Sequence, residues 1–140
     1  MSRVFWDTNL FIYLVERSEG WGDRVRALRR RMLARGDQLY TSALTLGEVL
    51  VKPLQTGDEP LRRAYEQAIV GGALILPFDL RVAARYARVR ADRSIRPADA
   101  IQLACAAAAG MDLFITNDDR LSTKIVPGIQ FITSLQRAFL

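Results

Sequence analysis

The stretch RVFWDTN, residues 3–9, decides how the rest of the chain is interpreted. Residues 3–6 include a β-branched and two aromatic side chains, which predicts a short strand. The polar triplet Asp7-Thr8-Asn9 follows directly, and these residue types begin helices and occupy turns. Residues 10–15 are apolar and predict a buried first helix. The chain therefore opens with a strand that leads into a helix through an aspartate.

Outward from this stretch, predicted strands and helices alternate. Further strands are expected at residues 38–41, 73–77, 112–116 and 129–132. Helices are expected at residues 21–35, 42–51 (stopped by Pro53), 61–70, 79–93 and 97–109, with a short C-terminal helix after the last strand. No linker of domain scale and no repeat interrupts this order. We expect one domain, residues 1–140, with a three-layer α/β/α fold around a central, largely parallel sheet.

Two helices carry patterns of interest. In residues 21–35, an apolar stripe is predicted from Val25, Leu28, Met32 and Leu33. In residues 79–93, three arginines share one face at i, i+4 and i+7, namely Arg81, Arg85 and Arg88. The arginine face could hold a phosphate backbone, and it could equally be an ordinary solvated surface.

The composition excludes several chemistries. The chain of 140 residues has 20 Lys plus Arg, 15 Asp plus Glu and no histidine, which gives a formal charge of +5. Without imidazole, Ser-His-Asp and Cys-His catalysis and His-rich zinc sites are impossible. The single Cys105 allows neither an internal disulfide nor a cysteine-rich metal site. If the protein is an enzyme, carboxylates are the expected reagents.

The charge and hydropathy also bear on location and partners. Arginine outnumbers lysine 18 to 2, and guanidinium groups suit bidentate contacts with phosphate, although coding bias explains the same count. No window reaches the ~18 apolar residues that span a bilayer. The first six residues predict a strand rather than a secretory signal. We therefore expect a cytoplasmic protein that does not enter the membrane.

Four acidic residues stand out by position: Asp7, Glu48, Asp99 and Asp118. Each has a simple structural explanation. Asp7 could cap a helix, and Thr45-x-x-Glu48 matches a capping box. Asp99 lies where a helix dipole favours a negative charge, and Asp118 could form an Asx-turn.

Taken together, the four positions indicate more. Asp7 and Asp118 follow predicted strands, and Asp99 opens a helix near the same edge, where ligands bind in open parallel sheets. Clustered carboxylates raise one another's pKa, and a hard divalent cation relieves this repulsion. Oxygen ligands without Cys or His favour Mg²⁺, with Mn²⁺ as a substitute. Without these four acids the formal charge is 20 − 11 = +9, which suits a polyanion.

The sequence resembles the PIN-domain ribonucleases, and in length and order the VapC toxins of toxin–antitoxin pairs. The resemblance covers essentially the whole chain and rests on four motifs in order: Asp7-Thr8-Asn9, Thr45-x-x-Glu48-Val49, Pro97-Ala98-Asp99-Ala100 and Phe114-Ile115-Thr116-Asn117-Asp118. Their acids are separated by 41, 51 and 19 residues. No single motif is specific, but the ordered set is.

The resemblance implies roles for individual residues. Asp7, Glu48 and Asp99 would be the acidic triad that holds Mg²⁺, and Asp118 the fourth acid. Asn9 and Thr116 match positions that support the acids by hydrogen bonding. Asp118 is chosen over Asp119 by its Thr-x-Asp spacing. Asp119 stays the alternative for the fourth acid and is expected to cap the following turn.

The resemblance also implies a function and partners. It implies a Mg²⁺-dependent endoribonuclease, the toxin of a type II toxin–antitoxin system, which cleaves RNA needed for translation. It further implies a homodimer and a cognate antitoxin that inserts a segment into the acidic cleft. Residues 49–54 and 61–70 include apolar side chains that could form a partner groove or belong to the core.

Two other functions compete with this one. A metal-dependent phosphatase of another α/β class would begin similarly, but it needs a second aspartate where this chain has Asn9. A non-catalytic PIN-like RNA-binding module would have degenerate acids, whereas all four acids are present here.

Overall fold

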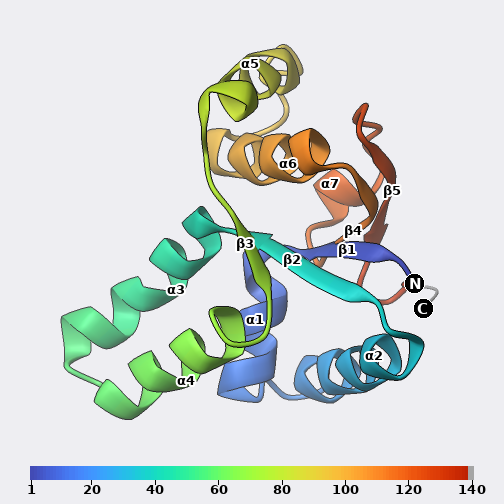
Figure 1. Ribbon diagram of the computed structural model, residues 1–140. Coiled ribbons are helices and arrows are strands. Elements are labelled where there is room, and N and C mark those ends of the chain that lie inside the picture. Colours follow the sequence, from blue (N-terminus) through green and yellow to red (C-terminus); the bar gives the residue numbers. More distant parts are fainter. Residues whose placement is uncertain (139–140) are drawn as a thin grey trace.

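The computed structural model describes residues 1–138 and shows a five-stranded sheet with helices on both faces (Figure 1). The strands are β1 (Arg3–Trp6), β2 (Gln38–Ser42), β3 (Leu74–Leu76), β4 (Met111–Thr116) and β5 (Ile129–Ser134). The helices are α1 (Thr8–Glu16), α2 (Trp21–Arg35), α3 (Ala43–Thr56), α4 (Glu59–Ile69), α5 (Leu80–Val89), α6 (Pro97–Ala109) and α7 (Asp119–Ser122). None of the helices within residues 1–138 has the length and apolar character that crossing a membrane requires.

The sheet has the strand order β3-β2-β1-β4-β5, and each neighbouring pair is parallel. The chain first adds β2 and β3 on one side of β1, and then returns to place β4 and β5 on the other side. The direction of winding therefore changes between β1 and β4. Ligands of open parallel sheets bind outside the carboxyl ends of the strands at such a point. The predicted three-layer fold around a parallel sheet is confirmed.

Two hydrophobic cores lie on opposite faces of the sheet, because successive side chains of a strand point to opposite sides. Val4 and Trp6 of β1 belong to one core, which they share with residues of α1, α2, α3 and α4. Phe5 belongs to the other core, with residues of α5, α6 and α7. In Figure 1, α5 and α6 lie above the sheet and α1 to α4 lie below it.

An aromatic pair joins the two strands on either side of the point where the winding changes. Phe5 of β1 is in register with Phe114 of β4, and both side chains are fully buried. Their rings stack with centroids 4.9 Å apart and an angle of 7° between the planes. Such a pair contributes ~0.5–1.5 kcal/mol beyond its burial. It keeps the carboxyl ends of β1 and β4 next to each other.

Helix α3 differs from its prediction. The expected stop at Pro53 is wrong, because α3 continues to Thr56 with the proline inside it. Pro53 has no N–H to donate to the Val49 carbonyl, which normally costs ~3 kcal/mol. The proline ring is buried, and the helix ends only a turn later at Gly57, whose φ of 69° suits glycine. Packing thus outweighs the local preference to stop.

Two smaller predictions also need correction. Leu33 does not belong to the apolar stripe of α2 and is 62% exposed, whereas Val25, Leu28 and Met32 are fully buried. Leu33 is one residue beyond Met32, which turns it by ~100° away from the core face. The short C-terminal helix is not formed in the described part, where residues 135–137 make a turn. Residues 139–140 lie outside the described residues.

Candidate active site

The four acids named from the sequence come together. Asp7, Glu48, Asp99 and Asp118 all line one pocket of about 310 Å³. Asp7 directly follows β1, and Asp118 is the second residue after β4. The pocket therefore lies at the carboxyl ends of the two strands between which the winding changes, as expected for a ligand site in this topology.

Asp7 is the most enclosed of the four, with 7% of its surface exposed. It is the N-cap of α1, and its Oδ1 accepts a hydrogen bond from the Thr8 N–H at 2.9 Å. Its Oδ2 accepts from the Thr116 hydroxyl at 2.7 Å. Burial raises the pKa of Asp7 from 3.8 to about 6, with a smaller contribution from the charge of Asp99, while these hydrogen bonds act in the opposite direction. Asp7 therefore both caps α1 and contributes a carboxylate to the pocket.

Glu48 reaches the pocket from α3. The N-cap of α3 is Ser42, whose hydroxyl accepts from the Thr45 N–H at 3.4 Å. Glu48 therefore does not complete a capping box. Its Oε1 instead accepts a hydrogen bond of 2.7 Å from the Thr8 hydroxyl, across 40 positions of sequence. This contact ties the third helix to the start of the first.

Asp99 lies in the first turn of α6, which begins with Pro97. The proline is suited to this position because its missing N–H would have no partner there. Asp99 accepts no hydrogen bond from any described residue. Burial raises the pKa of Asp99, and the charges of Asp118 and Glu48 act in the same direction. The carboxylate faces the pocket without a protein partner.

Asp118 is engaged by a neighbouring arginine. Its side chain caps α7 by accepting from the Arg120 N–H at 3.0 Å, and it also accepts from the Arg120 guanidinium at 2.6 and 3.1 Å. These bonds hold the pKa of Asp118 below its usual value. Asp119 is exposed and does not line the pocket. The expectation that Asp119 caps the turn is wrong, since Asp118 does so.

The two predicted supporting residues differ in their contacts. The Thr116 hydroxyl donates to Asp7 and accepts from the Asp118 N–H at 3.0 Å, so it connects two of the acids. Asn9 lines the pocket, and its Oδ1 accepts from the Asn117 N–H at 3.4 Å. Thr116 thus contacts an acid directly, whereas Asn9 holds the turn after β4.

Gln102 is a site residue that sequence reasoning missed. It lies on α6 one turn after Asp99, is 2% exposed and lines the pocket. Its amide nitrogen donates to the hydroxyls of Thr45 at 2.6 Å and Thr8 at 3.1 Å, and lies 3.5 Å from Asp7. Its oxygen accepts from the Ser42 hydroxyl. The available signal was its i+3 spacing from Asp99 within an otherwise alanine-rich helix.

The donor set of the pocket suits a hard cation, but the side chains do not form a closed cage. All the candidate ligands are carboxylate oxygens, which Mg²⁺ and Mn²⁺ prefer. Within residues 1–138, no group of three or more acidic or cysteine side chains is arranged so that it could hold a metal ion. Asp118 is paired with Arg120 and Glu48 with Thr8. A bound cation would require at least one of these contacts to rearrange.

Fold and site together define an α/β protein with an acidic pocket where the sheet changes its winding. Comparison with protein families matches residues 4–124 to the PIN domain, and the chain belongs to this family. Comparison with curated protein sequences gave no match. The PIN assignment leaves the phosphatase hypothesis without support.

Solved structures share this fold over nearly their whole length. A VapBC2 complex from Rickettsia felis bound to promoter DNA matches with a TM-score of 0.70 and 13% identity, covering 94% of this chain and 98% of that chain. A DNA-bound VapBC complex from Salmonella typhimurium matches with a TM-score of 0.68 and 19% identity, covering 96% of this chain and 99% of that chain. VapBC-5 from Mycobacterium tuberculosis matches with a TM-score of 0.61 and 22% identity, covering 95% of this chain and 99% of that chain. At these identities the likeness shows the fold.

Proposed function

We propose that the protein is a Mg²⁺-dependent endoribonuclease and the toxin of a type II toxin–antitoxin pair. One observation carries this proposal: four acids that are far apart in the sequence line the same pocket at the carboxyl ends of the strands. Membership of the PIN domain family supports a nuclease. The similar solved structures are toxin–antitoxin complexes, which supports the biological role.

Asp7, Glu48, Asp99 and Asp118 would hold the cation, and Mn²⁺ would substitute for Mg²⁺. Bound Mg²⁺ lowers the pKa of an attacking water and offsets the negative charge that develops on a phosphodiester. A cation held by the acids would supply this chemistry in a chain that has no histidine to act as a general base. The carboxylates and the cation together account for the catalytic groups.

The surrounding residues orient the acids. The Thr8 N–H and the Thr116 hydroxyl hold the two oxygens of Asp7, while the Thr8 hydroxyl holds Glu48. Gln102 connects Thr8 to Thr45, so that α1, α3 and α6 keep their mutual positions. Arg120 offsets the charge of Asp118 in the protein without a cation. These hydrogen bonds keep the acids at the pocket, and a bound cation would rearrange the contact of Glu48 or that of Asp118.

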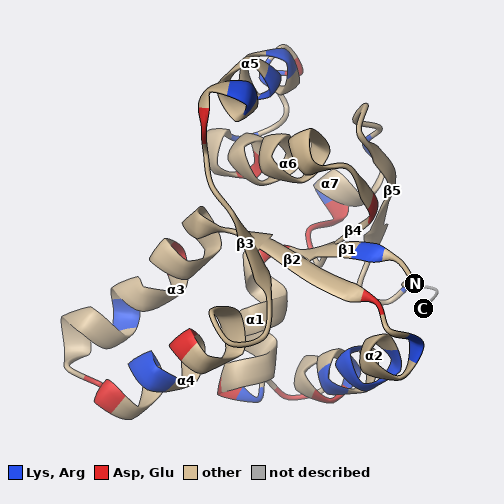
Figure 2. Cartoon of the chain, in the orientation of Figure 1, with Lys and Arg blue, Asp and Glu red and all other residues tan. Residues whose placement is uncertain are grey.

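The net positive charge of the chain suits an RNA substrate. The formal charge of +5 becomes +9 when the four pocket acids are set aside. Figure 2 shows arginines gathered on α2 and α5, on opposite sides of the sheet. Long-range attraction of this kind raises the rate at which a polyanion meets the protein. RNA needed for translation, in the cytoplasm, is the proposed substrate.

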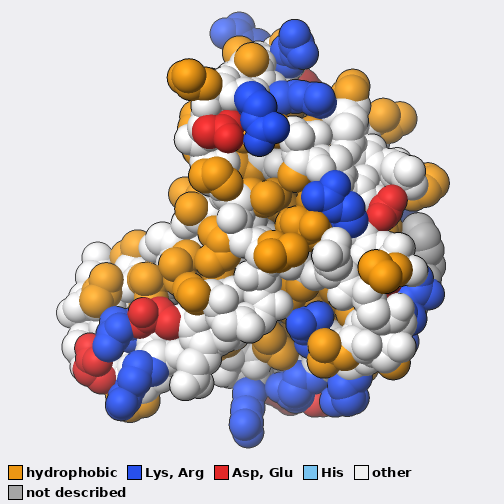
Figure 3. All heavy atoms as spheres, in the orientation of Figure 1, with side chains coloured by type: hydrophobic (Ala, Val, Ile, Leu, Met, Phe, Trp, Pro, Cys, Tyr) orange, Lys and Arg blue, Asp and Glu red, His pale blue; other side chains and the backbone are white. Residues whose placement is uncertain are grey.

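An exposed apolar surface suits protein partners. Val51 and Leu54 of α3, and Leu74, Phe78 and Leu80 around β3 and the start of α5, are large apolar side chains that are about half exposed or more. Figure 3 shows apolar side chains gathered over α3 and toward β3. Contiguous apolar surface of this kind marks protein interfaces. We propose that it contacts the antitoxin and a second copy of the chain in a homodimer.

The proposal is tested by incubating the purified protein with structured RNA in Mg²⁺, in Mn²⁺ and in EDTA. Cleavage should require the metal, and Asp7→Asn and Asp99→Asn should each abolish it in folded protein. Asp119→Asn is the matched control, because Asp119 is a neighbouring aspartate outside the pocket. Cleavage that persists in EDTA or in either pocket variant would show that the proposed metal mechanism is wrong.

A further inference from the structure

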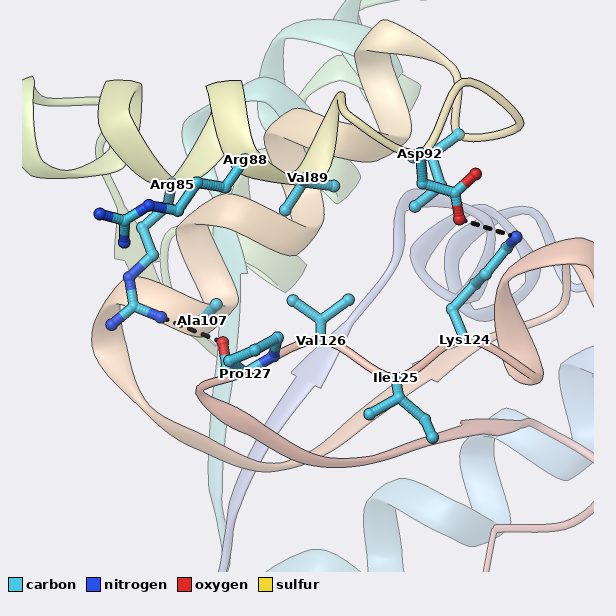
Figure 4. A pocket seen from close by; sticks show the side chains of 10 residues that line it. Arg85, Arg88, Val89, Asp92, Ala107, Lys124, Ile125, Val126 and Pro127 are labelled. Carbon is cyan, nitrogen blue, oxygen red and sulfur yellow. Dashed lines mark hydrogen bonds and ion pairs between the residues drawn. The ribbon is translucent and has the colours of Figure 1, made fainter.

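A second pocket lies between α5, the C-terminal half of α6 and the segment that joins α7 to β5 (Figure 4). Its volume is about 240 Å³. Val89 of α5 and Val126 of the joining segment form its apolar centre, and Ile125, which is 94% exposed, lies at its edge. Drug-sized ligands occupy pockets of ~300 Å³ or more, so this one suits a single small, mostly apolar group.

Positive charge borders the apolar centre. Figure 4 shows Arg85 and Arg88 at one end of the pocket and Lys124, paired with Asp92, at the other. Three cations therefore face one anion, for a formal +2. Arg88 is exposed, and its side chain makes no hydrogen bond or ion pair with any other described residue. Its guanidinium is free to bind phosphate or to lie against a planar base.

The end near Arg85 is closely built. The Arg85 guanidinium donates to the Pro127 carbonyl at 3.0 Å. The next residue is Gly128, with φ of +100°, and a Cβ there would lie 2.9 Å from the same guanidinium and 2.5 Å from the Ala107 carbonyl. Glycine is therefore required at this turn by its positive φ and by the close Ala107 carbonyl, and the Arg85 guanidinium packs against it. The contact makes the pocket wall a defined surface rather than a gap between loops.

The pocket adjoins the acidic site along the chain. Ile95, which lines it, is followed by Arg96, whose charge opposes the rise in the pKa of Asp99 that burial causes and contributes to the lowered pKa of Asp118. On the other side, Asp118 caps α7, and Lys124 follows two residues after that helix ends. The end of this pocket that holds Lys124 and Ile95 is therefore connected to the acidic site through α7 and the start of α6.

We propose that this second pocket is an RNA subsite, in which Arg88 binds a backbone phosphate and the apolar centre accepts one unpaired base of the same strand. The inference rests on the proposed ribonuclease function and names where the enzyme holds its substrate beyond the scissile bond. Sequence-specific proteins bind RNA through unstacked bases and through contacts to phosphate, and the pocket offers both kinds of surface. The arginine face of α5, noted in the sequence, acquires a role in this way.

The test measures binding of a short fluorescein-labelled single-stranded RNA of mixed sequence by anisotropy, in EDTA so that no cleavage occurs, over a series of salt concentrations. Arg88→Ala should weaken binding roughly tenfold. It should also reduce the slope of log K against log salt by ~0.7, the value for one lost phosphate contact with a single strand. Val89→Trp, which fills the apolar centre, should weaken binding fivefold or more with an unchanged slope.

Arg30→Ala is the matched control. Arg30 is an exposed helical arginine without a partner in the described residues, and it lies on α2, on the opposite side of the sheet from α5 (Figure 1). Its removal lowers the net charge by the same amount and should leave affinity and slope almost unchanged. Circular dichroism confirms folding. If Val89→Trp does not fold, Ile125→Glu replaces it, because Ile125 is almost fully exposed, and it should weaken binding.

The inference is wrong if Arg88→Ala and Arg30→Ala weaken binding equally, or if Arg88→Ala leaves the salt slope unchanged. It is also wrong if RNA binding survives in all pocket variants while binding of an acidic peptide such as polyglutamate is lost, which would identify a protein-docking site. Cleavage in Mg²⁺ is scored separately. Cleavage with normal binding by the variants would refute only the subsite, whereas no cleavage by the wild type would refute the proposed function.

Discussion

Replacing Asp7 by asparagine should make the protein more stable near neutral pH while abolishing activity. Burial raises the pKa of Asp7 from 3.8 to about 6, and this rise corresponds to ~3 kcal/mol by which ionised Asp7 destabilises the folded state. The folded protein binds the proton more tightly than the unfolded chain does. The cost is therefore absent below about pH 4, builds up between pH 4 and 6, and is fully present above pH 6.

Asparagine removes this cost but disturbs one hydrogen bond. Its oxygen can still accept from the Thr8 N–H, whereas the Thr116 hydroxyl loses a carboxylate acceptor, at a cost of ~1 kcal/mol. The expected net gain at pH 7.5 is ~1–2 kcal/mol, or roughly 3–6 °C in melting temperature for a chain of this length. Near pH 4 the gain should vanish or reverse.

The assay is thermal and urea unfolding in EDTA at about pH 4 and pH 7.5, followed by circular dichroism. Asp119→Asn, on the exposed neighbouring aspartate, is the control and should change stability at neither pH. Saturating Mn²⁺ should stabilise the wild type but not Asp7→Asn. The stability difference between the two proteins should therefore become smaller or change sign. A variant that is less stable than the wild type at pH 7.5, or a difference that does not depend on pH, would refute the reasoning.

Three further predictions follow from individual contacts. Gln102→Leu keeps the volume of a buried side chain but leaves the hydroxyl groups bonded to Gln102 unpaired. Urea unfolding should therefore show a loss of ~2 kcal/mol in stability. Unchanged stability would contradict the importance of these hydrogen bonds. Pro53→Ala restores a helical N–H at the expense of some buried surface. It should stabilise the protein by ~1 kcal/mol in the same assay. A loss of stability would show that the packing of the proline ring dominates. Arg120→Ala releases Asp118 from an exposed ion pair. Mn²⁺ binding, measured by calorimetry, should become up to about fivefold tighter. Weaker binding would contradict this prediction and would show that the arginine supports the site.

The elements that sequence reasoning predicted most accurately have local signals at their ends. Helices α2 and α6 have the expected bounds, since Gly36 adopts φ of 75° after α2, while Pro97 begins α6 and Gly110 ends it. The predicted stop at Pro53 was wrong because the proline is buried, and no local sequence pattern indicates that burial. Local sequence signals therefore predict the ends of a helix well where no tertiary contact overrides them.

The candidate site divides in a similar way. Asp7 and Asp118 could be found because each follows a strand, and parallel strands bring their carboxyl ends to one edge. Gln102 was missed because its partners lie 57 to 95 positions away in the sequence, and its i+3 spacing from Asp99 does not by itself indicate those contacts. The ion pair of Asp118 with Arg120 is local, but its direction toward the pocket depends on how α7 packs. Sequence position selected the acids, whereas tertiary contacts determine which polar residues orient them.

The central claim is that the four acids form a divalent-cation site. The most direct measurement is a crystal structure of the protein with Mn²⁺, in which anomalous scattering locates the metal. The claim predicts a metal peak in the acidic pocket with Asp7 and Asp99 as ligands at about 2.1 Å, and Glu48 or Asp118 reoriented toward it. A saturated crystal with no metal peak in this pocket, or a peak that neither Asp7 nor Asp99 contacts, would contradict the claim.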